Sequence, residues 1–251
     1  MNNQIRQMIE DGAIFYVSHS GGKDSQAMYA LLQLHVPHNQ MVVVHADLGD
    51  VEWQGTRAHI QDTTSHPLNV VRAIWADGSD KTLLGMVERR GMWPSSAHRQ
   101  CTSDLKRGPI YKFIRRDMKA RGATLAVNCM GLRAEESTAR AKLVDVKVNK
   151  LLSKAGRTVL DWLPIHDWDT GQVFAEIHDT GHEPHWAYAT GNERLSCMFC
   201  IMGSKNDLHN AARQNPHLAR KYLELEDKIG HTFFHKSSLK DLIATDLEQI
   251  V

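Results

Sequence analysis

Apolar runs alternate with amphipathic segments along the first half of the chain. A continuous apolar run rich in β-branched residues suits a strand that is buried on both faces of a sheet. Four such runs occur, at about 13–17, 41–45, 69–75 and 124–129. Helical patterns follow them, at roughly 25–35, 51–65, 79–90 and 104–120. This alternation predicts an α/β fold, in which a parallel twisted sheet of about five strands has helices on both faces.

The pattern changes beyond residue 130. Residues 141–160 are basic and irregular, and we interpret them as a mobile flap. From Asp169 the chain is mainly helical, with a loop rich in His and Trp at 181–200. The predicted helices span 169–180, 206–229 and 237–249. The sequence therefore predicts one domain over residues 1–200 and a helical C-terminal extension over 201–251 that packs on it.

Length and charge narrow the class of protein. The 251 residues fit one large domain, or one domain with an appended helical tail. The formal net charge of +1 gives no overall signature of polyanion binding. There is no apolar run of about 18 residues and no signal-peptide pattern, so we expect a cytoplasmic protein that uses no membrane. Four cysteines in such a chain favour metal or redox chemistry over a disulfide framework.

A glycine loop lies between the first predicted strand and the first predicted helix. Residues 18–25 read Ser-His-Ser-Gly-Gly-Lys-Asp-Ser. Gly21 and Gly22 allow the backbone to turn its amide hydrogens toward an anion, and the helix start adds N–H groups and a positive dipole end. Lys23 adds a point charge for phosphate oxygens. Asp24 stands where a Walker A loop needs Ser or Thr, so the sequence predicts a phosphate cradle of another class.

The polar side chains of this loop extend the predicted site. Ser18, Ser20 and Ser25 offer hydroxyl groups to a bound phosphate. Asp24 is expected either to hold Mg²⁺ or to orient the loop. Together with the glycines and Lys23, these residues form the predicted nucleotide-binding loop.

Two further strand ends are expected to border the same cleft, because ligands of open parallel sheets bind beyond the carboxyl ends of the strands. Asp47 follows the second strand, and the sequence leaves two roles open for it. It either binds a metal or a hydroxyl at the strand end, or caps the next helix. Gly131, Arg133 and Arg140 follow the fourth strand. The two arginines would share one face of a helix and suit bidentate binding of phosphate or sulfate, with a solvated charged face as the alternative.

Three cysteines predict a metal centre. Cys197 and Cys200 have the CxxC spacing that lets two thiolates reach one metal centre. Cys101 lies just before a predicted helix, whose dipole would favour the thiolate. Three thiolates fit a 4Fe–4S cluster, or a zinc ion if Cys129 or a histidine completes the ligands. For Cys129 a buried, inert thiol is the favoured interpretation.

Four ordered stretches resemble a known family. They are the SGGKDS loop, Cys-Thr-x-x-Leu-Lys-x-x-Pro at 101–109, Gly-Leu-Arg-x-x-Glu-Ser at 131–137 and Arg-x-x-Cys-x-x-Cys at 194–200. Together they resemble the PAPS reductase-like family of the adenine nucleotide alpha hydrolase (N-type ATP pyrophosphatase) superfamily. The likeness covers about residues 12–203 and is strongest to the DNA-phosphorothioation-type and phage or plasmid branch. The resemblance implies a Rossmann-like sheet and cleavage of ATP between its α and β phosphates.

The resemblance also implies roles for single residues. Ser20–Ser25 would bind the pyrophosphate part of ATP with Mg²⁺, and Lys106, Arg133 and Arg140 would meet the anionic part of the substrate. Lys23, Asp24, Lys106 and Arg133 are the expected catalytic residues. Cys101, Cys197 and Cys200 would ligate an iron–sulfur cluster beside the nucleotide.

Two departures from the family separate this chain from its reductases. Thr102 follows Cys101 where assimilatory APS reductases carry a second cysteine. No cysteine follows Cys200, so the nucleophile of the reductases' C-terminal Glu-Cys-Gly has no counterpart. Because thiosulfonate chemistry needs that thiol, APS or PAPS reduction is disfavoured.

The sequence therefore favours an ATP-dependent enzyme that adenylylates a substrate and couples this step to sulfur transfer through the cluster. Sulfonucleotide reduction is one alternative, and a nucleotide- and cluster-binding subunit of a DNA-modification or defence complex is another. The second alternative is supported by basic positions in the helical tail, namely Lys205, Arg213, Arg220 and Lys221. The expected partners are an adenine nucleotide, a sulfur donor or cysteine desulfurase, a nucleic acid substrate and a second copy of the chain.

Overall fold

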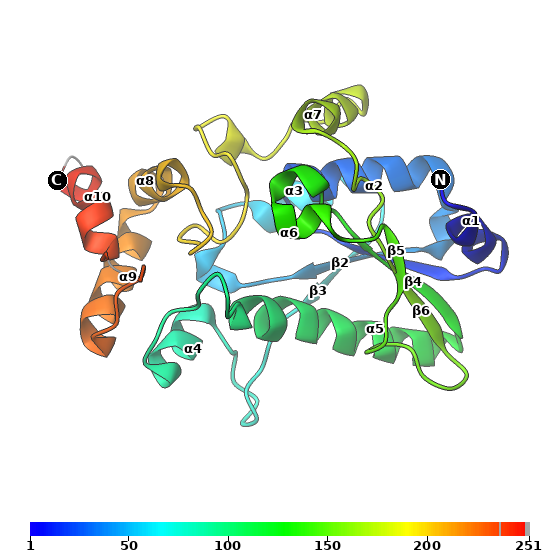
Figure 1. Ribbon diagram of the computed structural model, residues 1–251, viewed down its shortest axis with the longest axis horizontal. Helices are drawn as coiled ribbons and strands as arrows, with labels where there is room; N and C mark the ends of the chain where they lie inside the picture. The colour runs from blue at the N-terminus through cyan, green and yellow to red at the C-terminus, as the bar shows by residue number, and fades with distance from the viewer. Residues whose placement is uncertain (236, 249–251) are drawn as a thin grey trace. The chain divides into compact units, whose positions relative to one another are not determined.

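The computed structural model describes residues 1–235 and 237–248 and divides into two compact units (Figure 1). The sheet unit comprises Met1–Ala46, Gly55–Val71 and Ile110–His185. The helical unit comprises Asp47–Gln54, Arg72–Pro109 and the chain from Trp186 onward. The two units alternate along the sequence, whereas the predicted division at residue 200 is a single boundary. That division into domains stays a prediction.

Six strands form one sheet in the order β3-β2-β1-β4-β6-β5. Their bounds are β1 Ile14–Ser18, β2 Met41–Ala46, β3 Leu68–Val71, β4 Leu125–Met130, β5 Val146–Val148 and β6 Thr158–Trp162. All neighbouring strands are parallel except β5, which runs antiparallel to β6. The α/β class and the four predicted strands are confirmed, with the third ending four residues earlier than the apolar run suggested.

Residues 141–160 were wrongly predicted as a flap, because they contain β5 and the start of β6. The β6 segment Val159–Leu160 is buried beside β4, and β5 pairs only at the sheet edge. The few apolar residues of these short strands are interspersed with lysines and a glycine, so they form no continuous apolar run. For this reason the segment was interpreted from its basic character. The sheet therefore has six strands rather than about five.

Alternate strand residues point to two apolar layers, one on each face of the sheet. Phe15, Val43 and Val127 pack in one layer with residues of α1 (Asn3–Glu10), α2 (Lys23–His35), α3 (Thr56–Asp62) and α7 (Thr170–Asp179). Tyr16, Val44 and Ala126 pack in the other layer with α5 (Gly108–Arg121). Figure 1 shows α5 alone along its face and α2 with α7 on the opposite one. Helices on both faces cover β1, β2 and β4, which are buried over most of their length, as their continuous apolar runs required.

The helices of the sheet unit begin near the predicted positions. Their bounds are α1 Asn3–Glu10, α2 Lys23–His35, α3 Thr56–Asp62, α5 Gly108–Arg121, α6 Thr138–Ala141 and α7 Thr170–Asp179. The helix predicted over 51–65 is shorter, because a 3₁₀ turn at Gly49–Val51 and Gly55, with φ +80°, precede it. A left-handed residue of this kind interrupts a helix, so α3 begins only at Thr56.

The helical unit has its own apolar core. It contains α4 Leu83–Arg90, a π-helical segment Cys101–Arg107, α8 Lys205–Gln214, α9 Pro216–Ile229 and α10 Leu239–Glu248. Trp93, Tyr222 and Phe233 form the aromatic centre of this core, with Trp93 and Tyr222 stacked 5.3 Å apart. The predicted helix 206–229 is two helices, since Pro216 lacks the N–H that would continue α8. The helix predicted over 237–249 begins at Leu239, and residue 249 lies outside the described residues.

In the part of the chain that the structure describes, no helix is long and apolar enough to cross a membrane.

Candidate functional site

The glycine loop connects β1 to α2 in the sheet unit as predicted. Ser18 ends β1, Gly21 adopts a φ of +77°, and α2 begins at Lys23. A left-handed φ explains why a residue without Cβ is needed at Gly21. The start of α2 presents the N–H groups and the positive dipole end that an anion prefers. Lys23 is 5% exposed, so its ammonium group is held close to this turn rather than in solvent.

Side chains within the loop fix its shape. The Ser25 hydroxyl donates to the Gly22 carbonyl at 2.8 Å and accepts from the Ser20 amide at 3.1 Å. Ser25 therefore braces the loop, while the Ser20 hydroxyl, on an exposed residue, remains able to meet a phosphate. In the described contacts Ser25 has this structural role, and its phosphate contact stays a prediction.

His19 is a loop residue that sequence reasoning passed over. Its Nδ1 accepts a hydrogen bond from the Gly21 amide at 3.1 Å, and its ring is 2% exposed. Burial, with smaller contributions from His45 and His59, lowers the pKa of His19 to about 3. The ring is therefore neutral at pH 7, which leaves Nδ1 available as an acceptor. In the sequence, the position of His19 between the predicted strand and the loop glycines was the signal that could have identified it.

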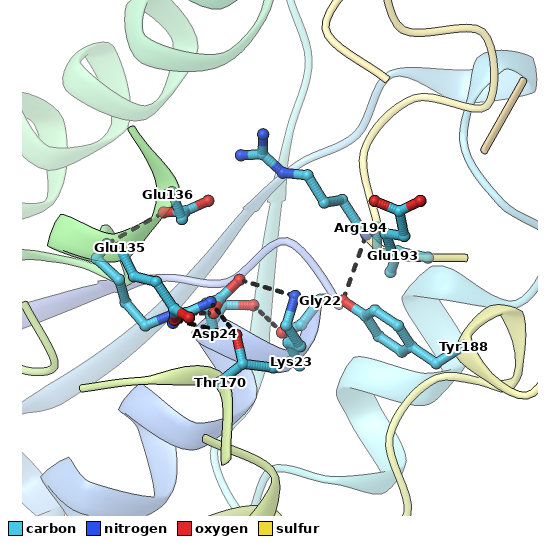
Figure 2. A network of polar contacts seen from close by, with 12 residues as sticks. Gly22, Lys23, Asp24, Glu135, Glu136, Thr170, Tyr188, Glu193 and Arg194 are labelled. Atoms are coloured by element: carbon cyan, nitrogen blue, oxygen red, sulfur yellow. Dashed lines mark hydrogen bonds and ion pairs between the residues drawn. The ribbon is translucent and has the colours of Figure 1, made fainter. Parts of the chain in front are cut away.

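A buried ion pair anchors the start of α2. Arg133 Nε lies 2.6 Å from Asp24 Oδ1, and the Arg133 guanidinium also contacts Glu135. Further hydrogen bonds join the Arg133 guanidinium to the Trp168 carbonyl and the Thr170 hydroxyl, both at 3.2 Å. Figure 2 shows Asp24, Glu135 and Thr170 converging here. The Arg133 side chain is 3% exposed and holds Asp24, and its predicted contact with a substrate anion stays a prediction.

The ion pairs of Asp24 correspond to the second of its two predicted roles, and Mg²⁺ binding stays a prediction. The Asp24 carboxylate lies between the Arg133 guanidinium and the Lys23 ammonium, at 2.6 and 3.7 Å. A carboxylate held between two cations orients them and reduces their mutual repulsion. The described contacts thus support orientation of the loop by Asp24.

Gly131 supports the same helix start by its lack of a side chain. A Cβ at this position would lie 2.7 Å from the Asp24 carbonyl oxygen and 2.9 Å from its carbon. Backbone atoms cannot move aside as a flexible side chain can. Gly131 is therefore required for the close approach of the β4 end to α2, and its assignment to the nucleotide site stays a prediction.

Arg140 does not continue a helix from Arg133. The segment consists of a 3₁₀ turn, Ala134–Glu136, followed by the short α6, so the predicted common helix face is wrong. Arg140 instead pairs with Glu136, whose carboxylate also accepts from the Arg133 amide at 3.1 Å. The two arginines are thus joined through one carboxylate.

Asp47 belongs to the helical unit, where it has partners of its own. One carboxylate oxygen accepts from the Gly49 amide at 2.7 Å, and the other meets Arg72 at 2.6 Å. This geometry corresponds to the capping alternative for Asp47, since the carboxylate closes the turn at Gly49–Val51.

The three predicted metal ligands come together in the helical unit. Cys197 donates a hydrogen bond to Cys200, which lowers the pKa of the Cys200 thiol and, together with burial, raises that of Cys197. The pKa of Cys101 is raised, chiefly by burial and next by Cys200. Its predicted activation by a helix dipole is wrong, because Cys101 begins a π-helical segment in a half-buried place where desolvation dominates.

Two further side chains face this group of sulfurs. Lys106 lowers the pKa of all three thiols through its charge, so its ammonium lies near the cysteines. Tyr222 is fully buried, and burial raises the pKa of its phenol, with each of the three cysteines raising it further. Its hydroxyl has no hydrogen-bond partner among the described residues. A buried donor without an acceptor is costly, and a group held by the cysteines would supply that acceptor.

The kind of metal at the three cysteines stays a prediction. Thiolates around a single tetrahedral zinc ion would stand about 3.8 Å apart, given Zn–S bonds of roughly 2.3 Å. Thiolates of an iron–sulfur cluster bind different irons and so spread further. Both alternatives that the sequence left open therefore stay open at this group.

Cys129 is not part of this group. It lies in β4, is 0% exposed and packs in an apolar layer of the sheet unit. Burial raises its pKa well above that of an ordinary thiol. Cys129 is therefore a buried core residue, and its assignment as a ligand is not supported.

A family comparison now settles the class of the chain. The phosphoadenosine phosphosulfate reductase domain matches residues 14–202. The chain belongs to this family. No curated protein sequence matches it. The DNA-phosphorothioation branch is a finer assignment that stays a prediction.

One solved structure supports the fold. Phosphoadenylyl-sulfate reductase from Candida auris, solved with phosphate, aligns with a TM-score of 0.51 at 15% identity, over 79% of this chain and 88% of that one. FMN adenylyltransferase from Candida glabrata, solved with FAD and pyrophosphate, gives a TM-score of 0.47 at 14% identity, over 74% and 55%. The first likeness confirms the Rossmann-like α/β fold of the family.

Proposed function

We propose that this chain binds ATP at the glycine loop and cleaves it between the α and β phosphates, transferring the adenylyl group to a substrate. In this reaction an oxygen of the acceptor forms a bond to the α-phosphorus, and the bond from that phosphorus to the α–β bridging oxygen breaks. Pyrophosphate leaves with the electrons of the broken bond, as its Mg²⁺ complex. Family membership supports the coarser statement that the protein is an enzyme acting on an adenine nucleotide.

One observation carries the proposal, namely the complete and braced loop between β1 and α2. Gly21 with positive φ, the Ser25 brace and the Asp24–Arg133 pair hold the shape of the loop. Pre-organised donors of this kind stabilise charge without reorganising when the reaction occurs. The Lys23 ammonium and the helix dipole are suited to the charge that grows on departing pyrophosphate.

The cysteine group extends this proposal to sulfur transfer. Cys101, Cys197 and Cys200 would hold a 4Fe–4S cluster, which when bound supplies an iron with an open position for a sulfur ligand. Lys106 would balance the negative charge of the thiolates, and the buried Tyr222 hydroxyl would donate to a sulfur. These residues bind and orient; the sulfur donor and the acceptor are the predicted partners.

Pyrophosphate release tests the nucleotide chemistry. The purified protein with MgATP should release pyrophosphate and AMP, and Lys23→Ala should abolish this release. Lys240→Ala removes an exposed lysine of α10 and serves as the matched control. Release of inorganic phosphate alone, or equal activity in both variants, would exclude the assignment.

Anaerobic purification tests the cluster. We expect a visible absorption band with iron and acid-labile sulfide in the wild type, and its loss in Cys197→Ser. Cys129→Ser, a change of a cysteine outside the group, should retain the iron. Stoichiometric zinc in place of iron would contradict the cluster.

Sulfonucleotide reduction remains a second candidate, since the family match names that domain. It requires a thiol nucleophile, and the chain has none after Cys200. Sulfite formation from APS or PAPS with thioredoxin present would establish it.

A further inference from the structure

We propose that a basic groove on the sheet unit binds the phosphate backbone of a nucleic acid. The groove lies between the C-terminal half of α5 and residues 151–157, which join β5 to β6, and it encloses about 720 Å³. Arg115, Lys119, Lys154 and Arg157 line it. Figure 1 shows the β5–β6 connection running beside the end of α5. We refer to this hollow as the α5 groove.

The charge of these two segments contrasts with that of the chain. Residues 110–123 and 147–157 contain nine lysines and arginines and one acidic residue, Asp117, whereas the whole chain has a net charge of +1. Among the nine, Arg121 has an ion-pair partner in the described residues, which is Asp117 at 2.7 Å. Positive charge is therefore concentrated in these two segments, and four of the nine cations line the hollow.

The fold itself does not require this concentration of charge. Lys119 and Arg121 lie in the last turn of α5, where cations interact favourably with the helix dipole. Arg115 and Lys154 have no such explanation, and like charges around one hollow repel each other. A bound polyanion would relieve this repulsion.

The loop that forms the second wall is held in place. Asn149 donates to the Tyr111 hydroxyl and to Asp161, both at 2.8 Å, which ties the loop to α5 and to β6. Arg157 Nε donates to the Leu152 carbonyl at 2.8 Å, and Leu152 is fully buried. A pre-formed groove loses little conformational entropy when it binds.

A nucleic acid fits this surface better than an anionic membrane does. Membrane-surface helices present an apolar face to the lipid. The apolar residues Phe113, Ile114 and Met118 of α5 are instead buried against the sheet. The lining cations surround a hollow, and such a hollow can follow a protruding chain of phosphates.

The α5 groove differs from the basic positions that the sequence suggested in the helical tail. Arg213 and Lys221 of the tail are paired with Asp246 and Asp50, so much of that charge is compensated. The binding proposed here does not depend on ATP cleavage. Only the further idea that the bound nucleic acid accepts the adenylyl group rests on the proposed function.

Fluorescence anisotropy with the full chain tests the groove. The probes are labelled single-stranded DNA, duplex DNA and an RNA hairpin, each of about 20 nucleotides or base pairs, titrated without ATP at several salt concentrations. The test variant is Arg115→Gln/Lys119→Gln/Lys154→Gln. The control is Arg6→Gln/Arg57→Gln/Lys240→Gln, which removes the same charge from exposed positions outside the groove.

We expect the groove variant to bind at least one probe about tenfold more weakly than the wild type. The slope of log K against log salt should fall by roughly 2 to 3, since each phosphate contact contributes about 0.9 for duplex DNA. The control should stay within about twofold of wild type. If the triple variant fails to fold by circular dichroism, Lys154→Gln alone, in the exposed loop, should still weaken binding measurably.

Three results would overturn the proposal. They are equal losses in both triple variants, no binding of any probe at low salt, and binding of vesicles with anionic lipid but not of nucleic acid. Pyrophosphate release is measured separately. Groove binding without ATP cleavage would refute the proposed function alone, and cleavage without binding would refute the groove alone.

Discussion

Replacement of Arg133 by Met is the sharpest test of how the nucleotide loop is held. The change removes a guanidinium whose side chain is 3% exposed and leaves the Asp24 carboxylate, 20% exposed, without that partner. The Trp168 carbonyl and the Thr170 hydroxyl also lose hydrogen bonds of 3.2 Å. Met fills a similar volume, so the loss is mainly electrostatic.

Breaking a buried pair by removing one partner costs about 3–5 kcal/mol. Water reaches part of Asp24, which reduces the cost, so we expect the free energy of unfolding to fall by about 3 kcal/mol. The matched control is Arg121→Met, whose side chain is 44% exposed and whose partner is Asp117. Exposed pairs of this type contribute up to about 0.5 kcal/mol.

Urea denaturation followed by circular dichroism measures both variants. A double-mutant cycle with Asp24→Asn isolates the pair, and a coupling of at least about 1 kcal/mol is expected. Binding of a non-hydrolysable ATP analogue should weaken in Arg133→Met, since Asp24 lies in the first turn of α2. The anchoring role of Arg133 would be refuted if Arg133→Met lowered the free energy of unfolding by less than about 1 kcal/mol and its effect simply added to that of Asp24→Asn.

Three other substitutions test the nucleotide loop and the cysteine group. His19 is neutral in the folded protein down to a pH of about 3 but protonates in the unfolded chain near pH 6.5, so the free energy of unfolding falls as the pH drops below 6.5. Urea denaturation at pH 7 and pH 5 should show that His19→Asn loses about 2 kcal/mol less of this free energy than the wild type does. Equal losses in the two proteins would contradict the buried, neutral state of His19. Gly131→Ala should destabilise by about 1–3 kcal/mol and weaken nucleotide binding, because its Cβ meets the Asp24 backbone, whereas Gly171→Ala in α7 should not. Tyr222→Phe should leave the metal-free protein at least as stable but release iron faster to a chelator; an unchanged release rate would count against a Tyr222 hydrogen bond to the cluster.

The residues of the nucleotide loop and of the cysteine group could be predicted from the sequence, but the contacts between distant residues could not. Gly21, Gly22 and Lys23 were recognisable because strand, loop and helix are consecutive in the sequence. Cys197 and Cys200 were recognisable from their spacing. Arg133 was found, but its partner was not, since Asp24 lies 109 positions away. Pairing at that separation is set by strand order rather than by any local pattern.

The β5–β6 segment shows why part of the fold escaped prediction. Val146–Val148 is a strand because it pairs with β6, and its own residues are half-buried or exposed. Short edge strands carry little apolar periodicity, so a lysine-rich segment gives no strand signal. The same lysines became informative only when the fold placed them across from α5.

The sequence by itself determined the α/β class, the central strands, the phosphate loop and the cysteine group. These features depend on local apolar runs and on residues close together in the chain. The tertiary structure decided that Arg133 anchors Asp24, that Cys129 is a core residue, that Tyr222 faces the cysteines and that basic residues from α5 and residues 151–157 share one groove. Each of these depends on which distant segments are brought into contact, and on the water that such contact excludes.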